Sequence, residues 1–444
     1  MGRIQDTLGE HVELMNSTKQ RNRIYTQHWN NESPAAWLSS ESREALDGKL
    51  VRVSVNFIRL AVRSLVERLT LRGFSRDGES GVDRGLLKVS QLVDLSARAE
   101  TLHVDRALYG AAYATVWATA DGRQPVLLTD TGENVSVERD PATGEIRSGA
   151  RVWRDGDRAF AVLMDRDTVR RFSTPLVEGG ELTGALEWQQ LDAQDNALEA
   201  VPIVPFIRQQ STHDTHGVSA VADIVELVDA LAKALGDAMV TSEYYAKPRR
   251  YATGLEIMED EDGNPVDPFG KSRLLQSESP DTKFGQLPAS TPSGQVELIA
   301  TLTQQIGALT GLPAHYMGLH GNQPASAEGV RAAETQLVTA ARTEMRSLDG
   351  PWGRVADLLA AVRDGGHPAD YGYSTHWENP EIKTPAQAAD AAGKLRDIGI
   401  PLETLLREPL GFDPENIDDI VAKANQERIV SNMNLGGGYR GTSI

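Results

Sequence analysis

Two helix-forming segments separated by a turn-rich stretch most constrain the fold of this 444-residue chain. Residues 218–246 repeat apolar side chains at helical spacing, and residues 296–310 do the same over a shorter length. Residues 247–290 between them are rich in acidic side chains and turn formers. A loop and a longer helix pattern, beginning at Ser326, come next. This order predicts two helices that flank a β excursion, followed by a loop and a long helix.

The first of these helices carries a narrow apolar stripe, formed by positions 221, 224, 225, 228, 231, 235 and 239. Alanines lie beside the stripe, and acidic side chains such as Asp223 and Asp229 occupy the other faces. A helix of this kind packs well against copies of itself or against a partner helix. An ordinary helix of a globular core would show the same stripe, so both interpretations stay open.

Composition excludes several classes of protein. With 40% hydrophobic residues the chain can bury a sizeable core, and its length suggests about three domains. We expect no membrane span, because no run of about 18 apolar residues occurs, and no secretory signal at the start. Without cysteine there are no disulfides or thiolate zinc sites, which fits a reducing compartment. The net charge of −18 argues against a general basic surface for nucleic acid.

The remaining segments predict an α+β fold. Residues 55–69 have the spacing of a helix with one buried face, and Gly73 supplies its stop signal. Residues 112–205 contain short β-forming segments between turn signals, which predicts an antiparallel meander closed by Pro202 and Pro205. Gly350-Pro351 should break or kink the long helix. Residues 384–430 predict short helices that begin with proline.

A nucleotide-binding loop is one alternative for the β excursion, since Gly270-Lys271-Ser272 ends like a phosphate-binding loop. Pro265 stands where that loop needs glycine, and no apolar strand leads into it. A calcium loop fails as well, because counting back from Gly263 places Met258 at the first ligand position. A β-hairpin turn at Asp262-Gly263 fits better.

His213 and His216 have a spacing that could bind a metal, but no third ligand lies near them in the sequence. The simpler interpretation is a polar loop that caps the following helix, with Thr215 or Gly217 near its start. The sequence contains no motif typical of a catalytic site. We therefore expect a protein that is not an enzyme and needs no cofactor or metal.

A basic cluster surrounds the β excursion of this acidic chain. Ordinary surface side chains are one interpretation, and an electrostatic docking face for another protein, or brief contact with DNA, is the other. The cluster consists of Lys247, Arg249, Arg250, Lys271, Arg273 and Lys283.

Five sequence segments, in order along the chain, resemble the portal proteins of tailed bacteriophages, in particular the Gp6-like portals of siphophages. They are 56–59 with 67–74 (NFIR, ERLTLRGF), 105–113 with Val116-Trp117 (DRALYGAAY), 247–251 (KPRRY), 310–318 (TGLPAHYMG) and 326–337 (SAEGVRAAETQL). The resemblance extends from about residue 15 to about residue 430. It implies a mixed α/β wing, a two-helix stem, a small β-containing clip and a long helix in the second half.

The resemblance also implies a division of the chain, and each segment receives one role from it. The wing takes 1–216 and, with a short crown, 326–430; the stem helices take 217–246 and 291–311; the clip takes 247–290; the tunnel loop takes 312–325; and a disordered tail takes 431–444. The tunnel loop would line a DNA channel, and it contains no lysine, arginine or carboxylate. Its proposed channel residues are His315, Tyr316, His320, Asn322 and Gln323.

The function implied is a ring, usually of twelve subunits, at one capsid vertex. DNA would pass through it during packaging and ejection, and the clip would dock the large terminase subunit and a head–tail adaptor. Major capsid and scaffold proteins would be further partners, with assembly in the host bacterial cytoplasm and no membrane involved. Another virion assembly or scaffold component is the alternative, and an enzyme that uses Gly270-Lys271-Ser272 is a more distant one.

Overall fold

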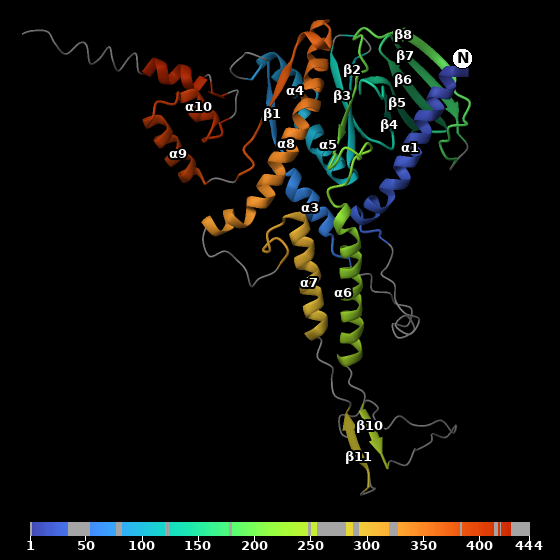
Figure 1. The fold of residues 1–444 in the computed structure, drawn as a ribbon, viewed down its shortest axis with the longest axis vertical. Helices are drawn as coiled ribbons and strands as arrows, with labels where there is room; N and C mark the ends of the chain where they lie inside the picture. The colour runs from blue at the N-terminus through green and yellow to red at the C-terminus, as the bar shows by residue number, and fades with distance from the viewer. Residues whose placement is uncertain are drawn as a thin grey trace, which may run out of the picture.

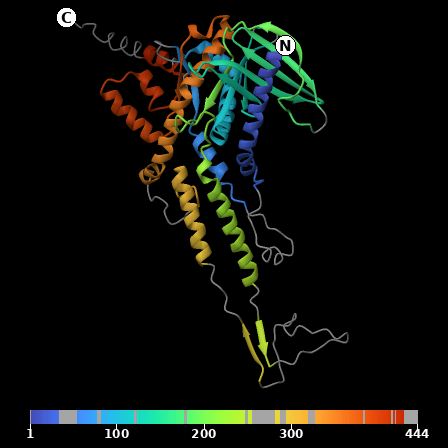
Figure 2. The same cartoon turned by 45° about the vertical axis from the view of Figure 1, so that its right-hand side comes forward.

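The computed structural model describes residues 2–33, 54–76, 82–119, 122, 124–176, 180–246, 250–254, 281–286, 293–318, 327–381, 384–412, 416–417 and 419–427. A broad body of helices and sheets occupies one end of the molecule (Figure 1). Two long helices project from the body side by side, and a short hairpin lies beyond them. The turned view keeps this arrangement, with the helical pair still clear of the body (Figure 2). The α+β class is therefore confirmed.

A five-stranded antiparallel meander forms one side of the body, with strand order β4-β5-β6-β7-β8. Helix α1 (Gly2–Trp29) lies across it and buries Leu8, Val12 and Met15 against the sheet. The meander predicted from the turn signals is thus confirmed for these strands. Their bounds are β4 Val135–Arg139, β5 Ile146–Asp155, β6 Arg158–Asp165, β7 Thr168–Pro175 and β8 Gln189–Asp195.

A second sheet has three strands, ordered β3-β2-β9, and packs against the meander through Ile203, Val135 and Val169. Its strands are β2 (Ala111–Ala118), β3 (Pro125–Thr131) and β9 (Ile203–Ile207). The prediction that Pro202 and Pro205 close the β region is wrong, because Pro205 lies inside β9 opposite Tyr113. Strand β9 is at the edge of this sheet, where a residue without an N–H is tolerated.

The largest hydrophobic core lies on this second sheet and is covered mainly by four helices, while Val228, Leu231 and Ile306 of the two projecting helices also reach it. Trp352 is fully buried there, with its ring centroid 4.9 Å from that of Phe206, and its indole N–H donates to Nε2 of His103 at 2.9 Å. The helices are α3 Phe57–Val66, α4 Arg84–Leu92, α5 Leu95–Tyr109 and α8 Ala327–Asp364.

Helix α3 confirms the periodicity of residues 55–69, since Ile58, Val62 and Leu65 face the core. Gly73 does not end this helix, as the stop signal had suggested. The helix ends at Val66, and Gly73 lies in strand β1 (Leu71–Arg76) beside a bulge. Its φ is +152°, and a Cβ there would lie 2.8 Å from Cγ1 of Val82. Glycine is required at this position because the backbone φ is positive and because the side chain of Val82 leaves no room for a Cβ.

Strand β1 pairs with β12 (Tyr373–Trp377), which follows α8 and the short helix η3 (Pro368–Asp370). Helix α8 runs unbroken through Pro351, so of the predicted break or kink the break does not occur. An interior proline costs about 3 kcal/mol. Trp352, Val355 and Leu359 directly after it are fully buried, and each contributes roughly 1.5–3 kcal/mol. Burial of this face outweighs the proline.

The projecting pair consists of α6 (Val225–Ala246) and α7 (Ser293–Thr310), with Gln295 Nε2 donating to Thr241 Oγ1 at 2.9 Å between them. Beyond it, β10 (Arg250–Thr253) pairs with β11 (Lys283–Gln286). Both predicted helices are confirmed. The first begins later than predicted, after the 3-10 turn η1 (Ala222–Ile224).

The predicted cap at Thr215 or Gly217 is therefore wrong. Ser219 Oγ accepts from the N–H of Val221 instead, immediately before η1. Gly217 has a φ of +87°, and a Cβ there would lie 2.2 Å from the carbonyl oxygen of Gly110. The glycine allows two backbone segments to cross where the chain leaves the body.

The C-terminal helices follow the proline signals only in part. Helix α9 (Pro385–Asp397) has proline at its first position, as predicted, and Thr384 and Gln387 form a capping box ahead of it. Helix α10 (Leu402–Arg407) has Pro401 at the N-cap rather than at the first helical position. A helix also includes residues 419–427. The predicted tail at 431–444 lies outside the described residues.

Burial of His11 generates a prediction about stability and pH. Its ring contacts Ser136 Oγ at 2.8 Å and Ser148 Oγ at 3.1 Å, and burial lowers its pKa from 6.5 to about 4. The folded state then binds fewer protons than the unfolded state, so stability present above pH 6.5 is lost as pH falls toward 4. For His11 the loss at pH 5 is on the order of 2 kcal/mol.

His11→Gln should therefore flatten the pH dependence of the free energy of unfolding between pH 6.5 and 4, as measured by urea denaturation. His213→Gln, at an exposed loop position, is the matched control and should keep the wild-type slope. Equal slopes for wild type and His11→Gln would contradict the assignment of a buried neutral imidazole.

Candidate channel turn and roots of the helical pair

The turn that follows α7 has a defined conformation up to Gly318. Gly311 has a φ of +69°, and the N–H of Leu312 donates to the carbonyl of Gly307 at 3.1 Å, which is the helix-ending Schellman arrangement. Leu312 and Met317 are buried in the main core. The N–H groups of Tyr316, Met317 and Gly318 donate to carbonyls three residues earlier. We call residues 311–318 the second root of the helical pair.

Tyr316 fastens the second root to the body through its hydroxyl. This group donates to Glu334 Oε1 of α8 at 3.1 Å, and Glu334 Oε2 pairs with Arg68 at 3.0 Å. Arg68 also donates to the carbonyl of Pro380 at 2.7 Å. Both Arg68 and Glu334 are buried. Burial raises the pKa of Tyr316, so the hydroxyl keeps the proton it donates to Glu334.

The first root, residues 208–218, leads into η1 and α6 and is fastened in a similar way. Glu344 of α8 accepts from Arg208 Nε at 2.7 Å and forms a buried ion pair with Arg106 of α5. Arg106 also donates to Ser347 Oγ at 2.8 Å. Burial alone would raise the pKa of Glu344, but the guanidiniums of Arg106 and Arg208 outweigh it and lower that pKa.

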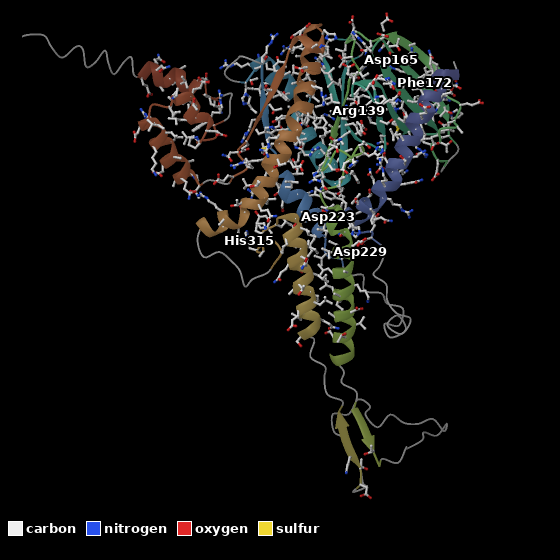
Figure 3. All side chains as sticks on the ribbon, viewed as in Figure 1. Arg139, Asp165, Phe172, Asp223, Asp229 and His315 are labelled. Atoms are coloured by element: carbon white, nitrogen blue, oxygen red, sulfur yellow. The ribbon has the colours of Figure 1, made fainter. Side chains whose placement is uncertain are left out.

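The predicted channel residues fall partly on the second root. His315 lies close to where α7 ends and α8 begins, with its ring edge-on to that of Tyr316 at 4.8 Å between centroids (Figure 3). Both side chains are half-buried. The hydroxyl of Tyr316 is already engaged within the chain, which gives this residue an anchoring contact. His320, Asn322 and Gln323 lie outside the described residues.

The predicted docking cluster can be placed only at the β10–β11 hairpin. Lys283 begins β11 opposite Thr253, with an exposed side chain, and Arg250 begins β10 opposite Gln286. The pairing shows that the two ends of the β excursion meet. Lys247, Arg249, Lys271 and Arg273 lie outside the described residues, as do the Asp262-Gly263 turn and Gly270-Lys271-Ser272.

The two projecting helices differ in charge. Helix α6 exposes Glu226 and Asp229, the latter also 3.4 Å from His28 of α1 and visible on its upper half (Figure 3). Helix α7 has Glu297 as its single charged residue. Large apolar side chains are nevertheless exposed on the pair, namely Met239, Val296, Leu298 and Leu309. Leu298 and Leu309 are eleven positions apart and therefore lie on the same side of α7, where they suit contact with another helix.

The histidines considered for a metal site lie in the loop that precedes η1. His213 and His216 are largely exposed, and partial burial of the His216 ring, together with the charge of Arg21, lowers the pKa of His216. Within the described ranges, no three His, Asp or Glu side chains are grouped so that they could hold a metal ion. Among the helices of those same ranges, none combines the length and apolarity needed to cross a membrane.

Residues 11–429 match the family model described as phage portal protein, SPP1 Gp6-like. The chain belongs to this family.

Two portal proteins are similar in sequence. That of Mycobacterium phage D29 is 26% identical over 415 residues, covering 87% of this chain and 83% of the relative. That of Mycobacterium phage L5 is 26% identical over 360 residues, covering 77% and 72%.

Two solved structures have partial similarity to this portal-family chain. One is the virion of a native gene transfer agent particle, with 13% identity and a TM-score of 0.46 over 82% of this chain and 91% of the other. The second is the neck of an empty gene transfer agent particle computed with C6 symmetry, with 13% identity and a TM-score of 0.47 over 83% and 92%.

Sequence reasoning missed the buried ion pairs at the two roots, although most of their residues lie in the segments that carry the portal resemblance. Arg68, Arg106, Tyr316 and Glu334 each belong to one of those segments. Spacing gave no sign of the pairing, since Arg68 and Glu334 are 266 positions apart. The available signal was the helical spacing of Glu334 and Glu344 with apolar positions of the same helix, namely Leu337, Ala341 and Leu348.

Removing the carboxylate charge of Glu344 should destabilise the body strongly. In Glu344→Gln, two guanidiniums would stay buried without a counter-charge, at a cost of about 3–5 kcal/mol. Glu378→Gln is the matched control, because its ion pair with Arg72 is largely exposed and should contribute less than about 1 kcal/mol. Urea denaturation measures both, and similar losses in the two variants would contradict the account of the first root.

Proposed function

We propose that this chain assembles into a closed ring at one capsid vertex and that double-stranded DNA passes through the ring during packaging and ejection. The family match across residues 11–429 is the observation that carries the proposal. Two curated relatives that bear the name portal protein, each matched over most of its length, support it further. A ring of about twelve copies is what the family resemblance suggests.

Exposed apolar side chains on the helical pair support ring formation. Val296, Leu298 and Leu309 of α7 are each more than half exposed in a single copy. Head-to-tail contacts close into a ring when each subunit offers two different complementary faces. We assign α6 and α7 to the stem, 247–290 to the clip, and 1–216 with 326–430 to the wing and short crown.

Charge supports the role of a conduit. Each chain has a formal net charge of −18, so twelve copies would carry about −216 before counterions. Tight binding of DNA needs lysine or arginine at many phosphates. A ring with this balance would let DNA move past instead of holding it. Residues 312–325, proposed as the tunnel loop, contribute no formal charge. Since the hydroxyl of Tyr316 is bound to Glu334, the loop offers His315, His320, Asn322 and Gln323 for short-range polar contact.

Lysines introduced into the tunnel loop should slow DNA passage. We expect Asn322→Lys/Gln323→Lys to stall genome packaging while rings and procapsids form normally, because each new cation adds a phosphate contact. The matched control, Asn322→Ser/Gln323→Ser, changes the same positions without adding charge and should package normally. Packaging rate and packaged genome length are the measurements. Unchanged values in the lysine variant would remove this loop from the DNA path.

The clip is the segment that we propose docks the large terminase subunit and, after packaging, the head–tail adaptor. Its basic cluster in an acidic chain is the support for this assignment. Reversing the charge at Arg249, Arg250 and Lys271 should weaken both partners, more so at low salt, and leave ring formation intact. Surface plasmon resonance at two salt concentrations measures the effect. An adaptor affinity equal to that of the wild type would refute the docking role.

The same protein would contact the major capsid and scaffold proteins during assembly in the host cytoplasm and would remain in the virion. A different virion component is the alternative function, and it predicts assemblies without a central channel. An enzyme using Gly270-Lys271-Ser272 is the other, and it predicts ATP hydrolysis that Lys271→Ala abolishes. We expect no hydrolysis in either form.

A further inference from the structure

Helix α8 carries two buried carboxylates. One contacts the first root, through which the chain enters the helical pair, and the other contacts the second root, through which it leaves. Glu334 and Glu344 are ten positions apart, which is about 15 Å along a helix. Each is less than 10% exposed. Each also accepts from an arginine of the body, Arg68 for Glu334 and Arg106 for Glu344.

The remaining oxygen of each carboxylate receives a donor from one root. At the second root, the hydroxyl of Tyr316 occupies Oε1 of Glu334. At the first root, Arg208 occupies Oε1 of Glu344, and its Nη1 also reaches the carbonyl of Val218 at 3.2 Å. The roots are therefore fastened to one helix by equivalent contacts, although they are about a hundred residues apart in the chain.

Backbone contacts make the first root rigid as well. The N–H of Val218 donates to the carbonyl of Arg208 at 2.9 Å, and the N–H of Arg208 donates to the carbonyl of Gly110 at 2.8 Å. A Cβ at Gly110 would lie 2.6 Å from the nitrogen of Val218, so the crossing is as close as backbone permits. Arg208 thus links the crossing point to α8.

We propose that Glu334 and Glu344 of α8 are positioning residues that clamp the helical pair at both of its roots. The clamp sets the direction in which α6 and α7 leave the body and holds the turn containing His315 in place. The effect on DNA passage rests on the proposed function, whereas the clamp itself is a property of the single chain. A displacement of the turn or of the helical pair is then transmitted to α8 instead of being absorbed at the roots.

Hydrogen–deuterium exchange of the full-length protein tests the clamp at the second root. Tyr316→Phe removes only the hydroxyl and leaves the Arg68–Glu334 pair intact, so the chain keeps its fold. Exchange of the amides of residues 316–318 should become about tenfold faster, because the lost hydrogen bond is to a charged group. Tyr109→Phe, which removes a hydroxyl contact to Thr26 elsewhere in the body, is the matched control and should leave these amides unchanged.

Arg208→Met tests the first root in the same way, since the Arg106–Glu344 pair remains. Amides of residues 217–220 should exchange faster, again about tenfold, while those of 316–318 keep the wild-type rate. The clamp is overturned if neither variant changes exchange at its own root, or if exchange rises equally throughout the body. Exchange alone decides the clamp, and packaging by the tunnel-loop lysine variant decides the channel role, so each can fail without the other.

Discussion

The buried ion pairs on α8 are the interactions on which the arrangement of body and helical pair depends. A buried carboxylate is costly unless it is paired and its other lone pairs are satisfied. Glu344 meets that condition through Arg106 and Arg208, and Glu334 meets it through Arg68 and Tyr316. These partners come from α5, both roots and the turn after α3, so a shift of α8 along its axis would leave buried charges unpaired. Apolar packing around Trp352 supplies most of the attraction and much less of this specificity.

Local sequence patterns predicted a helix or strand well where neighbouring residues alone determine its formation. The periodicity of α3, the proline and capping box of α9, and the turn signals between the meander strands are all decided within a few residues. Predictions failed where distant parts of the chain decide. Gly73 is required by strand pairing and by Val82, and the unbroken α8 at Pro351 depends on a core made by other helices. The late start of α6 depends on the crossing at Gly110.

The candidate site followed from the sequence only as segments, by resemblance, and not as contacts. The family resemblance marked residues 310–318 and 326–337, yet nothing in either segment states that Tyr316 and Glu334 meet. Tyr316 was expected to face DNA, and its hydroxyl is instead held by α8. In portal-family terms, the segments that identify the chain also contain residues that hold its helical pair in position. This supplies a physical reason for motifs that carry no catalytic chemistry.

Electron microscopy of the purified full-length protein, alone and after co-expression with its scaffold protein, tests the central claim most directly. The account predicts closed rings of about twelve subunits with a central channel, and helical pairs side by side around it. Exposed Leu298 and Leu309 should then be covered by a neighbouring copy. Particles that remain 48.3 kDa monomers in both preparations, or that assemble without a central channel, would contradict the account.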